Sequence, residues 1–117
     1  MTAPRDVKTY LDDILHAAQS IDWYTSGMTF KDFSLDSKTR DAVVRNLEII
    51  GEAVKRIPDA VRMRYPDIEW RPAAAMRDFL IHEYPEIDVR AVWNTIKADL
   101  PPFKSGVEKC LRELSVE

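Results

Sequence analysis

Apolar side chains recur at steps of three and four residues along most of this 117-residue chain, and this period constrains the fold more than any other feature. It is the period of an amphipathic helix whose apolar stripe faces a core. No stretch of useful length alternates apolar and polar residues as a strand does, and no Asn-Gly hairpin signal occurs. The pattern predicts an all-α fold, an up-and-down bundle of four to five helices with short connections.

Two long helices are expected in the first half of the chain, over residues 6–24 and 38–57. The segment between them, residues 26–36, contains a glycine, small polar side chains and no helical stripe. We interpret it as a loop that ends in a helix N-cap at Asp36 or Ser37.

Gly51 lies inside the second predicted helix. Glycine there costs about 1 kcal/mol relative to alanine, which indicates close approach of a neighbouring helix or chain at that level. Pro58 ends this helix, and a short helical turn is expected over residues 59–64.

Three further helices are expected in the second half of the chain. One opens near Trp70 and continues until Pro85 restrains the residue before it. Asp88 is the predicted N-cap of the next helix. The Pro101-Pro102 pair is expected to separate that helix from the last one.

Composition predicts one compact domain over residues 1–117. The single cysteine, Cys110, cannot form an intramolecular disulfide, and the two histidines are too far apart to suggest a local metal motif. We expect no metal and no cofactor. No run approaches the roughly 18 uninterrupted apolar residues of a membrane span, so a cytoplasmic protein without membrane contact is expected.

The formal net charge is -3, which disfavours indiscriminate binding of nucleic acid by bulk charge. Residues 37–64 nevertheless carry 7 basic and 4 acidic side chains. Two interpretations are open for the cations near the end of the second predicted helix: a solvated face, or a patch that faces RNA phosphates. These cations are Lys55, Arg56, Arg62 and Arg64.

Polar groups concentrate in the sequence MRDFLIHEYP, which contains Arg77, Asp78, His82 and Tyr84. Imidazole transfers protons near neutral pH and guanidinium grips phosphate, so this set suits a phosphodiester. On an ideal helix Arg77 and His82 lie about 140° apart, whereas Arg77 and Tyr84 lie within about 20°. The residues alone leave a second interpretation open, in which His82 is a structural histidine at a helix end and Arg77 belongs to a structural ion pair.

The motif RDFLIHEY matches an RxxxxHxY signature, and the chain around it resembles the HepT toxins of the HEPN superfamily. The resemblance covers nearly the whole chain. It includes the stretch LEIIGEAVKRIP, Trp70 ahead of the motif, and EIDVRAVWNTIKADLPPFK after it.

This resemblance implies a metal-independent endoribonuclease, the toxin of a type VII-like toxin-antitoxin pair that acts on tRNA or mRNA. It implies a homodimer with two motif helices along a shared cleft, which would also bring Arg77 and His82 to one site. Arg77 would then bind the scissile phosphate, and His82 would act as general acid or base while the ribose 2′-OH attacks. The expected products are a 2′,3′-cyclic phosphate and a 5′-OH.

The resemblance also assigns supporting roles. Asp78 stands where many relatives carry asparagine and could orient or weaken the action of Arg77, and Glu52 could line the cleft or pair with a nearby arginine. Tyr84 resembles the tyrosine that an MntA-like nucleotidyltransferase antitoxin modifies with AMP, which would place negative charge at the cleft. The alternative for Tyr84 is a tyrosine that caps the core with its hydroxyl in water.

Two other functions are compatible with the same residues. One is a non-catalytic HEPN module that binds nucleotide or substrate for a partner nucleotidyltransferase. The other is a purely structural helical bundle in which the motif is a coincidence. RNA cleavage that depends on Arg77 and His82 would distinguish the ribonuclease hypothesis from both of these alternatives.

Overall fold

The structure is a computed structural model, and it describes residues 3–77 and 88–116. Every regular element in these two ranges is helical, which confirms the predicted all-α fold. No helix within them is both long and apolar enough to cross a membrane. The elements are α1 (Ala3–Thr25), α2 (Phe30–Leu35), α3 (Ser37–Lys55), α4 (Asp59–Arg64), α5 (Trp70–Ala74), η1 (Ala75–Arg77), α7 (Val89–Asn94), η2 (Thr95–Asp99) and α8 (Leu100–Ser115).

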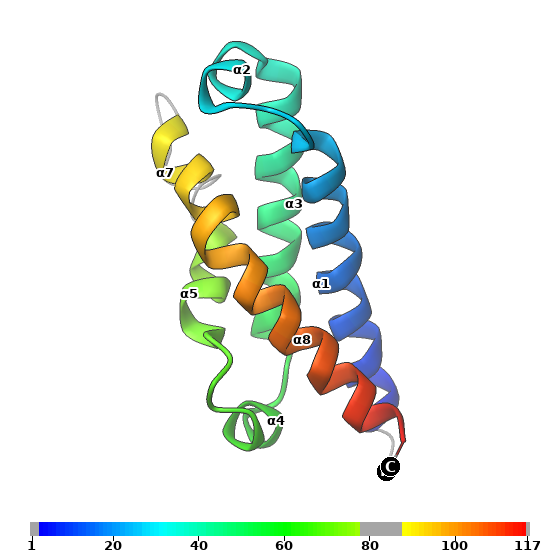
Figure 1. Cartoon of the computed structure of the whole chain (residues 1–117). Coiled ribbons are helices and arrows are strands. Elements are labelled where there is room, and N and C mark those ends of the chain that lie inside the picture. The colour runs from blue at the N-terminus through cyan, green and yellow to red at the C-terminus, as the bar shows by residue number, and fades with distance from the viewer. Residues whose placement is uncertain (1–2, 78–87, 117) are drawn as a thin grey trace.

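The two longest helices, α1 and α3, lie side by side and run in opposite directions (Figure 1). Helix α8 crosses them obliquely and packs on α1, while α5 and η1 pack on α3. Helix α2 closes one end of the bundle and α4 lies at the other end. This arrangement leaves α5 and α7 along one flank of the α1–α3 pair.

One apolar core joins these helices. Each helix contributes the apolar stripe that its sequence period predicts, so the interior contains aliphatic side chains with a few aromatic ones. The largest fully buried side chains are Leu11, Ile14, Ile21, Phe33, Leu47, Ile50, Ile57 and Leu100.

The segment before α3 departs from the predicted loop, because residues 30–35 form helix α2. A capping box explains this short helix: the Thr29 side chain accepts from the Asp32 backbone, and the Asp32 carboxylate accepts from the Thr29 backbone, both at 3.1 Å. Burial of Phe33 then fixes the helix on the core. Asp36 is the N-cap of α3, as predicted, and accepts from the Thr39 backbone at 3.0 Å.

The predicted separation at Pro101-Pro102 is wrong, because α7, η2 and α8 follow one another without a break. Proline cannot donate the helical hydrogen bond, and its ring collides with the carbonyl four residues earlier. The turn before the prolines, Thr95–Asp99, widens into a π-helix, which accommodates both effects. Asp88 caps α7 as predicted and accepts from the Ala91 backbone at 3.0 Å.

The helix predicted from Trp70 onwards begins at that residue, since α5 spans Trp70–Ala74. The chain then tightens into the 3-10 turn η1, which ends at Arg77. The remainder of that predicted helix, and Pro85 with it, lies outside the described residues.

Candidate active site around Arg77

Arg77 lies where the backbone of η1 touches helix α3, and Gly51 is the point of contact. A Cβ atom on Gly51 would lie 2.8 Å from the Arg77 backbone nitrogen and 2.9 Å from the Ala74 carbonyl oxygen. A side chain at that position would force one of the two backbones to move. The prediction that Gly51 marks a close approach is therefore confirmed, and the neighbour is the segment that carries Arg77.

The next residue of α3 contacts the arginine side chain. Glu52 Oε2 lies 3.2 Å from Arg77 Nε, which makes an ion pair between α3 and η1. The Nε atom is buried and its N–H is not aligned with any acceptor, so the attraction is electrostatic rather than a well-formed hydrogen bond. The Arg77 side chain remains 24% exposed and that of Glu52 52% exposed. A guanidinium held in this way at its inner nitrogen can still meet an anion at the surface.

The structure thus brings together two of the site residues that the sequence suggested, Arg77 and Glu52. Asp78, His82 and Tyr84 lie outside the described residues. Sequence reasoning considered an ion pair for Glu52 without naming its partner, because Glu52 and Arg77 are too far apart in sequence for any local rule to link them.

A groove between α1 and α3 begins beside Glu52. Its larger part has a volume of about 440 Å³, and its lining includes Tyr10, Glu48, Glu52 and Arg56. A smaller part of about 180 Å³ continues along the same two helices, and Ile49 lines both parts. The groove has charged rims of both signs and a partly apolar floor.

The four cations proposed for RNA binding make different contacts in the structure. Lys55 is exposed at the end of α3, and Arg56 lies 6.0 Å from the centre of the Tyr10 ring in the α1–α3 groove. Arg62 donates to the Ile57 carbonyl at 3.0 Å, which gives it a structural role at the end of α3.

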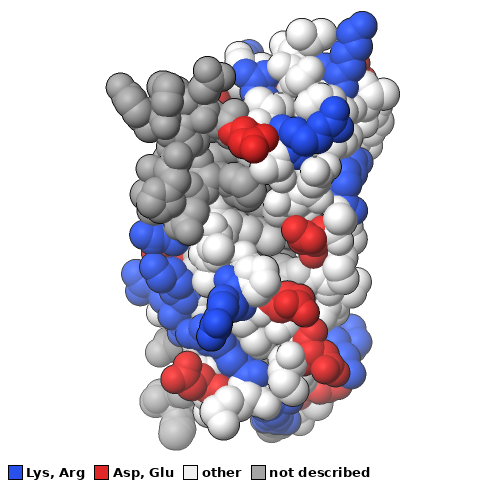
Figure 2. All heavy atoms as spheres, turned by 90° about the vertical axis from the view of Figure 1, so that its left-hand side faces the viewer, with Lys and Arg blue, Asp and Glu red and all other residues white. Residues whose placement is uncertain are grey.

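Arg64 lies 5.6 Å from the centre of the Tyr65 ring and lines a different cavity. Figure 2 shows lysine and arginine side chains in both the upper and the lower parts of one face, with carboxylates between them. These cations therefore have different neighbours, and their role in RNA binding stays a prediction.

The described residues contain no group of three or more His, Cys, Asp and Glu side chains placed to hold a metal ion. What they offer is an arginine that two consecutive residues of a neighbouring helix fix in place, within an all-α bundle. The all-α fold is that of the HEPN class of helical proteins.

Comparison with known proteins identifies the family within that class. The family described as "Ribonuclease HepT-like" matches residues 14–110. A protein of Thermococcus cleftensis named "Probable ribonuclease HepT" is 49% identical over 105 residues, which cover 90% of this chain and 96% of that protein. The chain belongs to the HepT-like ribonuclease family.

Other relatives extend the comparison. A protein of Methanocaldococcus jannaschii, named as a candidate RNase, is 42% identical over 110 residues, which cover 94% of this chain and 91% of that protein. Another candidate RNase, from Caldanaerobacter subterraneus, is 38% identical over 113 residues, which cover 97% of this chain and 98% of that protein. No solved structure matches the chain at a significant level.

Proposed function

We propose that the chain is a metal-independent endoribonuclease that acts as the toxin of a toxin-antitoxin pair. The observation that carries this proposal is the contact of the Gly51-Glu52 pair with Arg77, which fixes the arginine of an RxxxxHxY motif in a HepT-like chain. A fixed guanidinium stabilises developing phosphate charge better than a mobile one, because it needs no reorganisation during the reaction.

In the proposed reaction the ribose 2′-oxygen bonds to the neighbouring phosphorus while the bond from phosphorus to the 5′-oxygen breaks. The proton of the 2′-OH passes to a base, and the 5′-oxygen leaves with a proton from an acid. His82 acts in these proton transfers, and Arg77 binds the scissile phosphate as it gains charge. The products are a 2′,3′-cyclic phosphate and a 5′-OH.

Glu52 is a positioning residue in this scheme. Its carboxylate attracts Arg77 Nε, which leaves the outer guanidinium nitrogens as the face for phosphate. Asp78 follows Arg77 in the chain. Its negative charge either orients the Arg77 guanidinium or weakens the attraction between that guanidinium and the RNA phosphate.

The active form is a homodimer, and the α1–α3 groove supports this part of the proposal. The groove combines acidic residues (Glu48 and Glu52) with basic ones (Arg45 and Arg56), so the surface complements a second copy of itself. The partner copy brings its own Arg77 and His82 near the groove, which begins beside Glu52.

The proposed partner of the toxin is a nucleotidyltransferase antitoxin that transfers AMP to Tyr84. An added AMP group brings bulk and negative charge next to Arg77 and repels RNA phosphate. Co-expression with the neighbouring nucleotidyltransferase is expected to raise the intact mass by one or more AMP units, and Tyr84→Phe to prevent the increase. An increase that survives Tyr84→Phe would reject this target.

The main test is cleavage of single-stranded RNA in EDTA by wild type, Arg77→Ala and His82→Ala. Wild type is expected to cleave and to leave a cyclic phosphate, and both variants to lose at least about a hundredfold in rate, as general acid-base groups contribute. Lys104→Ala is the matched control, because Lys104 also forms an ion pair between two helices, with Asp22 of α1 at 2.9 Å, and does not line the α1–α3 groove.

The outcomes separate the candidate functions. Full cleavage by a clean preparation of His82→Ala would overturn the proposed mechanism. RNA binding or nucleotidyltransferase binding without any cleavage would instead indicate the non-catalytic HEPN module.

A further inference from the structure

Helices α2 and α7 meet at one end of the bundle (Figure 1), and three aromatic side chains join them. Phe33 is fully buried, and the centre of its ring lies 5.1 Å from that of Trp93. Phe30 meets the same Trp93 ring with 6.2 Å between the ring centres. Phe30 and Trp93 are only partly buried, so the cluster reaches the surface. Phe30, Phe33 and Trp93 form what we call the aromatic platform.

Two cations lie over this platform. The guanidinium carbon of Arg90 is 3.7 Å from the centre of the Phe30 ring, and Lys97 Nζ is 4.7 Å from the centre of the Trp93 ring. Both cationic residues are exposed to solvent. Cation–π attraction holds each charged group near one ring and restricts its motion. The platform therefore presents two positioned positive groups at the surface.

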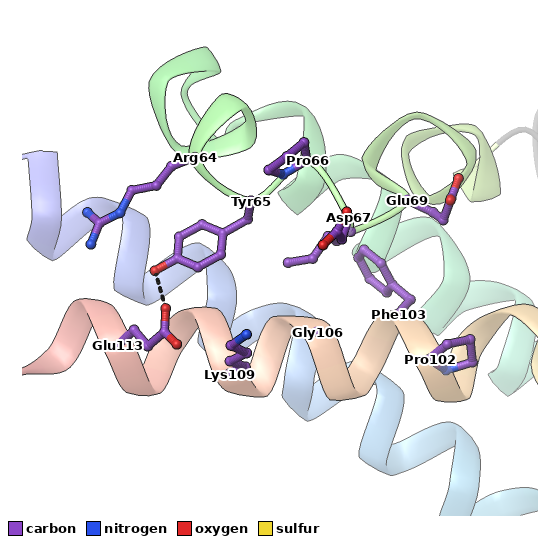
Figure 3. A pocket seen from close by; sticks show the side chains of 11 residues that line it. Arg64, Tyr65, Pro66, Asp67, Glu69, Pro102, Phe103, Gly106, Lys109 and Glu113 are labelled. Atoms are coloured by element: carbon purple, nitrogen blue, oxygen red, sulfur yellow. Dashed lines mark hydrogen bonds between the residues drawn. The ribbon is translucent and has the colours of Figure 1, made fainter.

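These two cations have no carboxylate partner within the described part of the chain. The side chains of Arg90 and Lys97 form no hydrogen bond or ion pair with any described residue. Other exposed cations lie among acids. Lys109, for example, lines a cavity between α8 and the connection from α4 to α5, which Asp67 and Glu113 also line (Figure 3). The positive charge on the platform is therefore available to an external anion.

The carboxylates of the same helices do not offset this charge. Asp32 accepts a hydrogen bond from the backbone at the start of α2 at 3.1 Å, and Asp88 accepts one from the backbone of α7 at 3.0 Å. A carboxylate in this position is attracted to the positive end of its own helix dipole. Asp99 is two positions from Lys97, a spacing at which helical side chains do not face each other.

We propose that Arg90 and Lys97 bind backbone phosphates of a single RNA strand at the aromatic platform. Guanidinium and ammonium groups donate charge-assisted hydrogen bonds to phosphate oxygens, and such contacts position a strand without reading its sequence. Arg90 follows Tyr84, the last residue of the RxxxxHxY motif, by six positions, so at most about 22 Å separates their Cα atoms. A strand bound at the motif can therefore extend to the platform. The choice of RNA rests on the proposed ribonuclease function, but neither cation takes part in the proposed cleavage step.

The test measures how RNA binding depends on salt. The probe is a fluorescein-labelled 2′-O-methyl oligouridine of about 12 nucleotides, which lacks the 2′-OH needed for cleavage and is long enough for a single-strand site. Fluorescence anisotropy gives its dissociation constant with the full-length protein at several KCl concentrations. Each phosphate contact to a single strand contributes about 0.7 to the slope of log K against log salt. Arg90→Gln combined with Lys97→Gln is expected to reduce the slope by about 1.4 and the affinity more than about tenfold at roughly 0.1 M KCl.

Two further double variants serve as controls. Lys109→Gln combined with Arg112→Gln removes the same two charges from exposed positions in the C-terminal part of α8, at the other end of the bundle. Its slope is expected to equal that of wild type. Arg90→Lys combined with Lys97→Arg keeps both charges and is expected to keep the slope as well. This second control separates the loss of charge from the loss of packing on the rings.

Three results would overturn the inference. The first is a wild type that does not bind the probe, and the second is an equal change of slope in the platform variant and the α8 control. The third is unchanged RNA binding by the platform variant with lost affinity for the neighbouring nucleotidyltransferase, which would assign the platform to a protein partner. Because the probe is not cleaved, the two proposals fail separately. Cleavage of RNA with an unchanged slope contradicts only the platform, and a reduced slope without cleavage contradicts only the ribonuclease.

Discussion

Arg77 receives two kinds of constraint from two consecutive residues of α3. Gly51 admits the backbone of η1, and Glu52 attracts the side-chain Nε atom. Backbone position and side-chain direction are therefore set by the same turn of one helix. This is the local arrangement that the proposed phosphate contact requires.

Glu52→Gln tests the positioning role. The amide keeps the shape of the side chain and loses its charge, so Arg77 loses its fixed direction. We expect RNA cleavage to fall roughly tenfold in kcat, as misplacement of a catalytic group does. The urea midpoint should stay nearly unchanged, because the Glu52 side chain is half exposed.

Asp22→Asn is the matched control for that variant. Asp22 is also a half-exposed carboxylate in an ion pair between two helices, with Lys104, and it does not line the α1–α3 groove. Equal kcat values for Glu52→Gln and Asp22→Asn would contradict the positioning role, and rescue by Glu52→Asp would support it.

A second prediction concerns pH and the buried thiol of α8. Burial, followed by the charge of Glu113, raises the pKa of Cys110 from 9.0 to about 11. Burial and the hydrogen bond to Glu113 also raise the pKa of Tyr65 above 10.0. In both cases the unfolded chain releases its proton at a lower pH than the folded one. The stabilising contribution is complete below pH 9 and is lost as pH rises through about 11.

Urea unfolding at several values between pH 8 and pH 11 checks this prediction. The midpoint is expected to fall steeply above pH 9 in wild type and less steeply in Cys110→Ala. If the urea midpoint of Cys110→Ala fell with pH as steeply as that of wild type, the loss of stability at alkaline pH would belong to other groups.

At the scale of elements, the contact between α3 and η1 is a close approach of two backbones. A methyl group at Gly51 would meet backbone atoms, which cannot turn away. Gly51→Ala should therefore destabilise the protein by about 1 kcal/mol, because overpacking at about 1–3 kcal/mol exceeds the helix-propensity gain of about 1 kcal/mol. It should also reduce RNA cleavage, since η1 must move. Urea denaturation and initial rates measure the two effects.

Gly106→Ala is the comparison for stability. Its added methyl group would meet the Ile68 side chain instead of backbone, and a side chain can change its rotamer. We expect a smaller loss of stability than for Gly51→Ala. A larger loss would show that side-chain adjustment is no easier than backbone adjustment in this bundle.

The helix boundaries also show which signals in the sequence were sufficient to predict them. Asp36 and Asp88 were identified as N-caps because capping is a local property of a few residues. Helix α2 was missed although Thr29 and Asp32 form a capping box, because its single buried aromatic residue, Phe33, gives no periodic stripe. The π-helical turn before Pro101 was missed because it depends on how the two flanking helices share one axis.

At the scale of the whole molecule, the α1–α3 groove is where the proposed homodimer is tested. Ile49 is half buried and lines both parts of the groove. Ile49→Arg places a charge in that surface, so we expect a dimer of wild type to become a monomer and to lose RNA cleavage. Sedimentation velocity at micromolar concentration measures the change.

Leu35→Arg is the control for the dimer experiment. Leu35 is 76% exposed on α2 and does not line the groove. A monomeric wild type would reject the dimer itself. A dimer that persists in Ile49→Arg would place the interface on another surface.

The sequence by itself determined the helical class, the main helix caps and the motif around Arg77, because each depends on residues a few positions apart. Only the tertiary structure decided that Glu52 pairs with Arg77, that Gly51 admits η1, and that Arg56 and Arg64 lie over different tyrosine rings. It also formed the cavity that Tyr65 and Lys109 line, two residues that are far apart in the sequence. These features depend on how the helices cross, and helix crossing brings together residues that no local pattern connects.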